Sequence, residues 1–199
     1  MWERKYCGHC GAALSNVLPS GDSRTRMACS ACNKIDYCGP TVLIEVGLTT
    51  PTSLLLVQRA QPPYQGMWAP VTGFVEPGET LEQAAAREVE EEVGIRVPPA
   101  DFVPAAISSV PQMNQIYCTF VAYFDDELPV FPDEHEVTCA KWFTQDRYPS
   151  DIWDPAHNFD VSAIYRHLRC RRFQFIQRNA DFLRVFEAGG NVRYVWRRS

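Results

Sequence analysis

At 199 residues, the chain is long enough for one catalytic core and a small additional module, and its hydrophobic content of 46% argues against intrinsic disorder. The formal net charge of −5 argues against a general affinity for nucleic acids. The apolar stretches at 41–46 and 53–57 are far shorter than the roughly 20 residues of a membrane-spanning helix, and no signal-type apolar region follows the first four residues. We therefore expect a cytoplasmic protein without a membrane partner.

Residues 1–38 are predicted to form a small zinc ribbon, because they are rich in Cys and Gly and hold too little apolar content for a core of their own. Two Cys-x-x-Cys pairs, Cys7/Cys10 and Cys29/Cys32, are separated by 18 residues, a spacing typical of two knuckles around one tetrahedral ion. Zinc is favoured over iron because nothing else in the sequence suggests electron transfer. The alternative to a metal site is a set of redox-active cysteine pairs. A closed four-thiolate site should stabilise folding and not catalyse.

The other candidates near these pairs fit the zinc site less well. His9 lies between two ligands and should point outward, and Cys38 follows Cys32 at a distance that fits neither knuckle. Cys118 and Cys139 fall in predicted strands, so we expect them to be buried core thiols.

Residues 39–146 are predicted to form an α/β domain. The segments with strand-like patterns are 41–48, 53–59, 102–110, 115–124 and 137–143. Residues 80–93 are predicted to form a helix, with Thr80 as N-cap, Gln83 completing a capping box and Gly94 ending the helix. Strands arranged around a helix indicate a layered α/β domain.

Three carboxylates, Glu88, Glu91 and Glu92, fall together on this helix beside its apolar stripe. Such carboxylates repel one another and are costly to desolvate unless a cation is present. A solvated helix with ion pairs is the alternative, but the segment 79–92 holds six acids and one base, Arg87. A hard divalent cation balances this charge, and Mg²⁺ suits phosphate substrates. The turn that starts at Gly73 lets the backbone approach, so the Gly73 carbonyl can add an oxygen ligand.

The segment from Gly73 to Ile95 resembles the Nudix box. All fixed positions of that motif are present: Gly73, Glu79, Arg87, Glu88, Glu91, Glu92, Gly94 and Ile95. The resemblance implies a Nudix-type α/β/α sandwich with a mixed sheet over residues 40–146, preceded here by the small zinc ribbon. It also implies an enzyme that hydrolyses the pyrophosphate bond of a nucleoside diphosphate derivative.

Carried over position by position, the resemblance implies that Glu88, Glu91 and Glu92 bind Mg²⁺ or Mn²⁺, and that Arg87 pairs with Glu79 in a structural role. In the family, metal-bound water attacks a phosphorus atom. The general base varies between members, so Glu88 is one candidate. Two acids in the loop before the last strand, Glu134 and Glu136, are the other candidates, and plain exposed loop acids are the alternative for both.

The last part, residues 147–199, is predicted to be a partly helical, Arg-rich extension. It begins with a loop at 148–160 and an amphipathic stretch at 161–168, followed by 173–186, which fits a helix or a strand, and a short strand at 191–196. Residues 165–199 contain nine Arg and two acids, a charge of +7, which leaves −12 elsewhere. A solvated or self-docked surface is preferred over a nucleic-acid patch, and a homodimer contact stays open.

The substrate has to be inferred from positions outside the box. Arg59 ends a strand where it is placed to reach a pyrophosphate, with a plain surface role as the alternative. Trp68 and Tyr117 are candidates for stacking on an adenine or isoalloxazine ring, with a core role as the alternative, and Gln115 is a further substrate-binding candidate.

Motifs outside the box leave two classes of substrate open. A zinc ribbon ahead of the box also resembles NADH pyrophosphatases, whose Ser-Gln-Pro-Trp-Pro-Phe-Pro motif is here replaced by Ser-Ser-Val-Pro-Gln-Met-Asn-Gln at 108–115. The arrangement of Pro111, Gln115 and Tyr117 resembles FAD and ADP-ribose pyrophosphatases. Hydrolysis of ADP-ribose or FAD to AMP is therefore the leading hypothesis, and NADH pyrophosphatase is the alternative. A third hypothesis, of another class, is a non-catalytic module whose ribbon and Arg-rich tail bind nucleic acid or protein.

Overall fold

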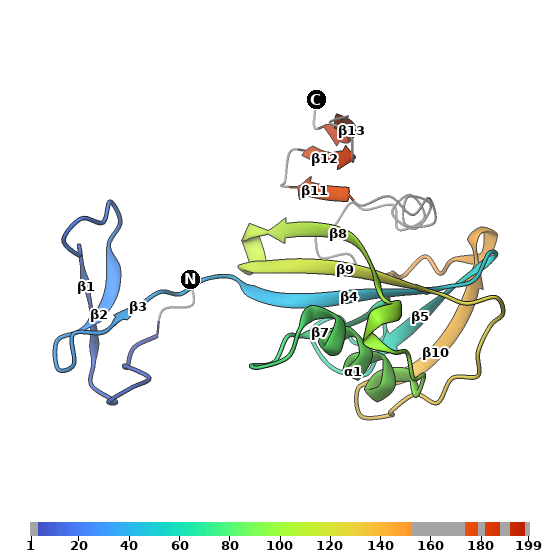
Figure 1. Cartoon of the computed structure of the whole chain (residues 1–199), viewed down its shortest axis with the longest axis horizontal. Coiled ribbons are helices and arrows are strands. Elements are labelled where there is room, and N and C mark those ends of the chain that lie inside the picture. The colour runs from blue at the N-terminus through green and yellow to red at the C-terminus, as the bar shows by residue number, and fades with distance from the viewer. Residues whose placement is uncertain (1–3, 153–173, 179–181, 188–191, 198–199) are drawn as a thin grey trace. The chain divides into compact units, whose positions relative to one another are not determined.

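The computed structural model describes residues 4–152, 174–178, 182–187 and 192–197, and it divides the chain into two compact units (Figure 1). The first unit is Met1–Pro40 and the second is Thr41–Ser199, so the division falls two residues beyond the predicted end of the ribbon at 38. Among the residues with a described structure, no helix has the length and apolar character that crossing a membrane requires.

The first unit is a three-stranded antiparallel sheet. Its strands are β1 (Leu14–Val17), β2 (Arg26–Cys29) and β3 (Ile35–Asp36), with β2 in the middle. Among residues 4–40, only Cys7 and Cys29 are buried, and both are zinc-site candidates, which agrees with the expectation that this unit has no hydrophobic core of its own.

The second unit is built on a mixed sheet. Its strands are β4 (Thr41–Thr49), β5 (Ser53–Arg59), β6 (Trp68–Ala69), β7 (Val71–Phe74), β8 (Val103–Val110), β9 (Gln115–Tyr123), β10 (Val137–Thr144), β11 (Gln174–Arg178), β12 (Phe182–Glu187) and β13 (Val192–Arg197). The strand order is β10-β5-β4-β9-β8-β11-β12-β13, with β6 on β5 and β7 on β4. The central strands β4 and β9 run parallel, whereas β9 and β8 run antiparallel. Three short 3₁₀ segments, Pro99–Asp101, Pro111–Met113 and Gln145–Arg147, lie in the connections.

The α-helix α1 (Leu81–Val93) forms as its capping residues predict. The Thr80 hydroxyl accepts a hydrogen bond from the backbone N–H of Gln83, and the Gln83 side-chain oxygen accepts one from the backbone N–H of Thr80. Gly94 ends the helix at a φ of 69°, a left-handed conformation that glycine adopts without a Cβ penalty. Both helix ends are therefore determined locally.

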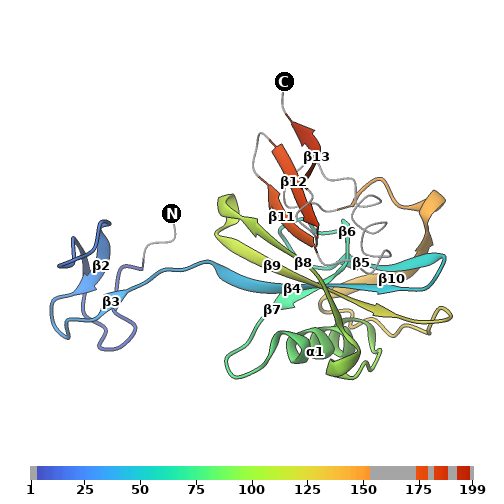
Figure 2. The ribbon, with the colours of Figure 1, turned by 45° about the horizontal axis from the view of Figure 1, so that its top comes forward.

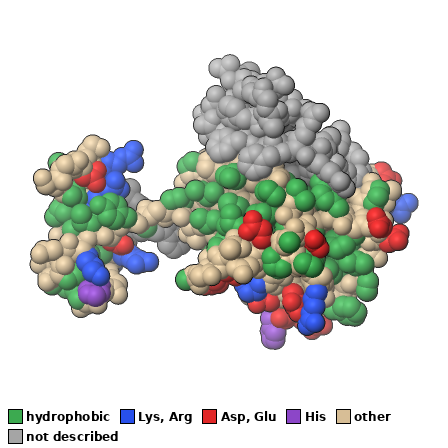
Figure 3. Space-filling model, viewed as in Figure 1, with side chains coloured by type: hydrophobic (Ala, Val, Ile, Leu, Met, Phe, Trp, Pro, Cys, Tyr) green, Lys and Arg blue, Asp and Glu red, His purple; other side chains and the backbone are tan. Residues whose placement is uncertain are grey.

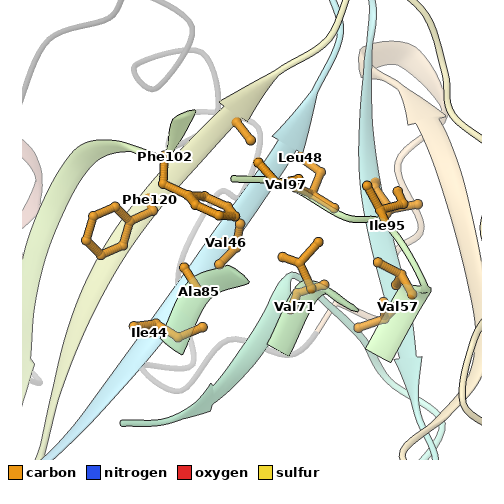
Figure 4. Close-up of a cluster of buried hydrophobic side chains, with 14 of the residues drawn as sticks. Ile44, Val46, Leu48, Val57, Val71, Ala85, Ile95, Val97, Phe102 and Phe120 are labelled. Carbon is orange, nitrogen blue, oxygen red and sulfur yellow. The ribbon is translucent and has the colours of Figure 1, made fainter. Parts of the chain in front are cut away.

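The main core lies between α1 and one face of the sheet (Figures 2 and 4). Ala85, Val89 and Val93 of the helix are fully buried, and they face β4 residues such as Val46, which is also fully buried. Burying apolar surface stabilises the packing of the helix on the sheet by about 25 cal/mol per Å². This packing decides which helix face is left for the acidic residues.

The elements near the C-terminus were predicted less completely than the rest of the fold. The described residues contain one α-helix, and the amphipathic stretch 161–168 lies outside them. The segment 173–186, left open between helix and strand, contains β11 and β12, and β13 corresponds to the strand expected at 191–196. β6 and β7 were missed, because Pro70 separates two strands too short to reveal an alternating pattern.

Candidate functional site

Glu88, Glu92 and Glu136 form a cluster of carboxylates. Each offers one oxygen that lies within 4.8 Å of the others. Glu88 and Glu92 stand one turn apart on α1 and are only 8% and 7% exposed, while Glu136 comes from the loop before β10 and is exposed. Three acids held this close repel one another, and burial makes two of them costly to ionise.

The electrostatics of the cluster fit a divalent cation. Burial raises the pKa of Glu92 well above its usual range, and the carboxylates of Glu88 and Glu136 raise it further. Burial also raises the pKa of Glu88, against the opposing effect of Arg87. One Glu92 oxygen, Oε2, is buried with no hydrogen-bond partner in the described structure. Because carboxylate oxygens are ligands that Mg²⁺ and Mn²⁺ prefer, a bound cation would satisfy this oxygen and balance the charge.

Gly73 of β7 lies directly against the Glu88 side chain. Gly73 lies opposite Ile44 of β4, and this strand pairing holds β7 beside the helix. A Cβ built on Gly73 would lie 1.9 Å from the Glu88 carboxylate oxygen Oε1, so only glycine lets the strand approach this closely. The expected role of the Gly73 carbonyl as a metal ligand stays a prediction.

Replacing Gly73 by Ala is therefore expected to displace the Glu88 carboxylate and to weaken Mg²⁺ binding by about 10-fold or more, as losing support around a metal ligand does. Gly39→Ala is the control, since a Cβ at Gly39 meets nothing within 4 Å. Titration with Mn²⁺, followed by electron paramagnetic resonance, measures the affinity. Equal affinities in the two variants would contradict the proposed placement of the cation.

Arg87 ties the loop before the helix to the carboxylates. Its guanidinium donates two hydrogen bonds to Glu79, at 2.9 and 3.2 Å, and one to the Phe74 carbonyl at 3.0 Å. It also donates to Glu88 at 2.8 Å and to Glu91 at 2.9 Å. Hydrogen bonds from Arg87 hold the pKa of Glu79 below its usual range. This is the structural pairing of Arg87 and Glu79 that the motif implies.

Glu91 lies apart from the three-acid cluster. Its side chain is 54% exposed and pairs with Arg87, whereas Glu88 and Glu92 turn toward the sheet. On a helix, position i+3 is displaced by about 60° from position i, here toward solvent. The structure therefore groups Glu88 with Glu92 and the loop acid Glu136, and metal binding by Glu91 stays a prediction.

The loop that carries Glu136 is attached to the C-terminal end of α1. The backbone N–H of Phe131 donates to the Val93 carbonyl at 2.9 Å, and that of Asp133 donates to the Glu92 carbonyl at 3.3 Å. These bonds satisfy helix carbonyls that have no partner within the helix. Glu136 is thereby brought to the cluster, while Glu134 lies outside it and is exposed.

The residues predicted to contact substrate have different positions. Arg59 ends β5, donates to the Pro63 carbonyl at 3.3 Å and lowers the pKa of Glu92 through its charge, which places it near the cluster. Trp68 is 8% exposed and packs edge-on against Phe143 at a centroid distance of 4.9 Å. Tyr117 is 1% exposed and donates to Gln115 at 3.0 Å.

Both rings lie in hydrophobic clusters of the core, as the alternative reading expected, and contact of Trp68 or Tyr117 with a substrate ring stays a prediction. Phe74 follows Gly73 directly and is 52% exposed, but as the next residue of β7 it points to the face opposite to Glu88.

The four predicted zinc ligands form a second cluster, in the first unit. The sulfur atoms of Cys7, Cys10, Cys29 and Cys32 lie within 4.8 Å of one another. Distances of 3.7 Å for Cys7–Cys32 and 3.5 Å for Cys10–Cys29 are those of ligands around a common centre. The backbone N–H groups of His9 and Cys10 lower the pKa of Cys7 to about 6, whereas burial and the neighbouring thiols raise the pKa of Cys32.

The two knuckles have the same backbone geometry. The N–H of Gly11 donates to the Cys7 carbonyl at 2.9 Å, and that of Asn33 donates to the Cys29 carbonyl at 2.8 Å. Gly11 and Asn33 both adopt a positive φ, at 75° and 56°. His9 and Cys38 are exposed, Cys118 is buried and Cys139 is half-buried.

Purified protein is expected to contain about one equivalent of zinc, and Cys7→Ser should lose the ion and make the first unit sensitive to proteases. Cys38→Ser is the control, since Cys38 lies outside the cluster. Metal analysis by mass spectrometry gives the stoichiometry. Less than half an equivalent in the wild-type protein, or zinc loss in the control, would contradict a structural four-cysteine site.

Comparisons with known proteins agree with both clusters. A family model described as the NUDIX domain matches residues 42–164, and one described as Nudix N-terminal, a zinc ribbon, matches residues 5–38. The chain is 36% identical over 146 residues to "NAD-capped RNA hydrolase NudC" of Klebsiella pneumoniae, and 37% identical over 145 residues to that of Shigella flexneri. Each match covers 73% of this chain and 53% of the relative, so the chain spans about half the length of these curated relatives.

Solved structures extend the comparison to the fold. A NUDIX hydrolase from Nitrosomonas europaea is 31% identical with a TM-score of 0.73, and the match covers 88% of this chain and 100% of the other. An ADP-ribose pyrophosphatase from Streptococcus suis is 17% identical with a TM-score of 0.56, and covers 70% of this chain and 99% of the other. The second likeness supports the fold alone.

Proposed function

The chain belongs to the Nudix family, and from this premise we propose that it is a divalent-cation-dependent hydrolase of the pyrophosphate bond in NAD-type dinucleotides. The observation that carries the proposal is the cluster of Glu88, Glu92 and Glu136, with one buried oxygen of Glu92 left without a partner. A binding module has no need of buried, mutually repelling acids, whereas phosphoryl chemistry uses the cation that they attract.

The residues around the cluster take distinct roles in this proposal. A bound Mg²⁺ or Mn²⁺ supplies charge neutralisation and an acidified water. Glu88 and Glu92 hold it, and Arg87 orients Glu88. Glu136 is the general base, because it reaches the cluster yet stays exposed to water. Arg59, whose charge acts on Glu92, stabilises negative charge on the phosphate that leaves.

The nicotinamide-dinucleotide class is favoured over ADP-ribose and FAD. The curated relatives, at 36% and 37% identity, are named as hydrolases of NAD-capped RNA. The ADP-ribose pyrophosphatase of similar fold is only 17% identical, which is too distant to support its substrate. NADH pyrophosphatase, the alternative from the sequence, is therefore our proposal, with free NAD(H) or an NAD cap on RNA as substrates. The segment 108–115 still differs from the NADH pyrophosphatase motif.

A substrate panel tests the proposal. NADH, NAD⁺, NAD-capped RNA, ADP-ribose, FAD and diadenosine polyphosphates would be compared by kcat/KM with Mg²⁺ and with Mn²⁺. NAD(H), free or as a cap, is expected to be hydrolysed with the highest kcat/KM, and EDTA should abolish the activity. A higher kcat/KM for ADP-ribose or FAD would overturn the choice of substrate, and activity that survives EDTA would overturn the metal dependence.

A further inference from the structure

The ribbon carries a row of three side chains on one face of its sheet, two of them exposed and one, Arg26, half-buried. In the register of the sheet, Val17 of β1 lies opposite Arg26 of β2, and Tyr37 follows Asp36, whose partner is Met27. Residues opposite one another in a sheet point to the same face, so Val17, Arg26 and Tyr37 form one row across the three strands. We call this row the ribbon platform.

The platform combines aromatic and cationic surfaces. The Arg26 guanidinium lies 5.4 Å from the centre of the Tyr37 ring, a cation–π arrangement, and Asp22 fixes the guanidinium with a salt bridge of 2.9 Å. Tyr37 is 66% exposed and Val17 is 39% exposed.

The charge of the ribbon is opposite to that of the whole chain. Residues 1–40 hold five basic residues and three acids, a charge of +2, against −5 overall. The five basic residues are Arg4, Lys5, Arg24, Arg26 and Lys34. Figure 3 shows hydrophobic and basic side chains close together on this unit. An exposed ring with a planar guanidinium and excess positive charge is the combination with which proteins stack bases and contact phosphates of single strands.

We propose that the ribbon platform binds single-stranded RNA. The inference rests on the proposed function, because it identifies the substrate as RNA that carries a dinucleotide at its 5′ end, with the ribbon holding the RNA. A second copy of the ribbon is disfavoured as occupant, since it would place like charges together. Because bases of any type have a π-face, this contact should be independent of RNA sequence.

Direct binding to the zinc-loaded full-length chain is the first test. A fluorescently labelled, uncapped 20-nucleotide RNA would be titrated by anisotropy. Tyr37→Ala is expected to weaken binding about 10-fold, the effect of losing a stacked base. Tyr6→Ala is the matched control, because Tyr6 is 65% exposed on the same unit but pairs with Ala13, outside the platform. Equal losses in the two variants, or none in either, would overturn the proposal.

Kinetics separate this inference from the proposed function. Tyr37→Ala is expected to lower kcat/KM for NAD-capped RNA about 10-fold and to leave that for free NADH unchanged. If Tyr37→Ala altered free NADH hydrolysis equally, the platform would serve the catalytic unit, and if it changed only the oligomeric mass, the platform would bind a second copy. Either result would overturn RNA binding. A wild-type protein that is inactive on both NADH and NAD-capped RNA but binds RNA through Tyr37 would instead refute the proposed function alone.

Discussion

Replacing Glu92 by Gln is expected to lower kcat for NADH about 10²- to 10³-fold while the protein stays folded, since neutralising charge in phosphoryl chemistry is worth several kcal/mol. The variant keeps the shape of the side chain but removes the charge that holds the cation. Glu90→Gln is the control on the same helix, because Glu90 is half-exposed and pairs with Arg96 at 2.7 Å, away from the cluster. Full activity of Glu92→Gln would refute the assignment.

The same substitution should leave the metal-free protein at least as stable as wild type. Because burial raises the pKa of Glu92, the native state favours the protonated acid, so its contribution to stability is present at low pH and is lost as the pH rises through the raised value. A neutral amide does not titrate. We therefore expect thermal unfolding in EDTA to show a loss of stability in wild type as the pH rises above the ordinary pKa of a carboxyl group. The loss should be smaller in Glu92→Gln.

Replacing Glu136 by Gln is expected to lower kcat by about 10²-fold, whereas Glu134→Gln should change it by no more than about twofold, since a general base contributes 10²- to 10⁴-fold. The two acids are near neighbours in one loop, but only Glu136 belongs to the carboxylate cluster. The pH–rate profile adds a second readout, because loss of the base should remove the limb at which activity rises with pH.

Wild-type activity in both variants would show that neither loop acid is the base. Glu88 would then be the remaining candidate from the sequence, at the centre of the same cluster. Loss of activity in Glu134→Gln alone would contradict the position that the loop has in the structure. The pair thus tests the loop geometry as well as the chemistry.

The features that were predictable from the sequence depend on local interactions. The capping box of Thr80 and Gln83 and the αL conformation of Gly94 need only nearby residues, so the helix was located correctly. The spacing of the cysteines likewise identified the four sulfur atoms that the structure groups.

The rest depends on contacts between distant segments. Glu136 joins the cluster because the N–H groups of Phe131 and Asp133 donate hydrogen bonds to carbonyls at the end of α1. No sequence pattern predicts these two contacts. Residue type also did not distinguish a buried ring from an exposed one: Tyr117 is 1% exposed, and Phe74 is 52% exposed. Periodicity gives the face of a strand, but the layer that covers that face is decided by the whole fold.

Hydrolysis of NADH in ¹⁸O-labelled water tests most directly whether this chain cleaves a pyrophosphate by attack of water on phosphorus. We predict AMP and reduced nicotinamide mononucleotide in equal amounts, with one ¹⁸O atom in the phosphate of one product, because no covalent enzyme intermediate is needed. Mass spectrometry of the two products gives the label and its position. Release of free nicotinamide or adenine, or of inorganic phosphate as the first product, would contradict hydrolysis at the pyrophosphate bond.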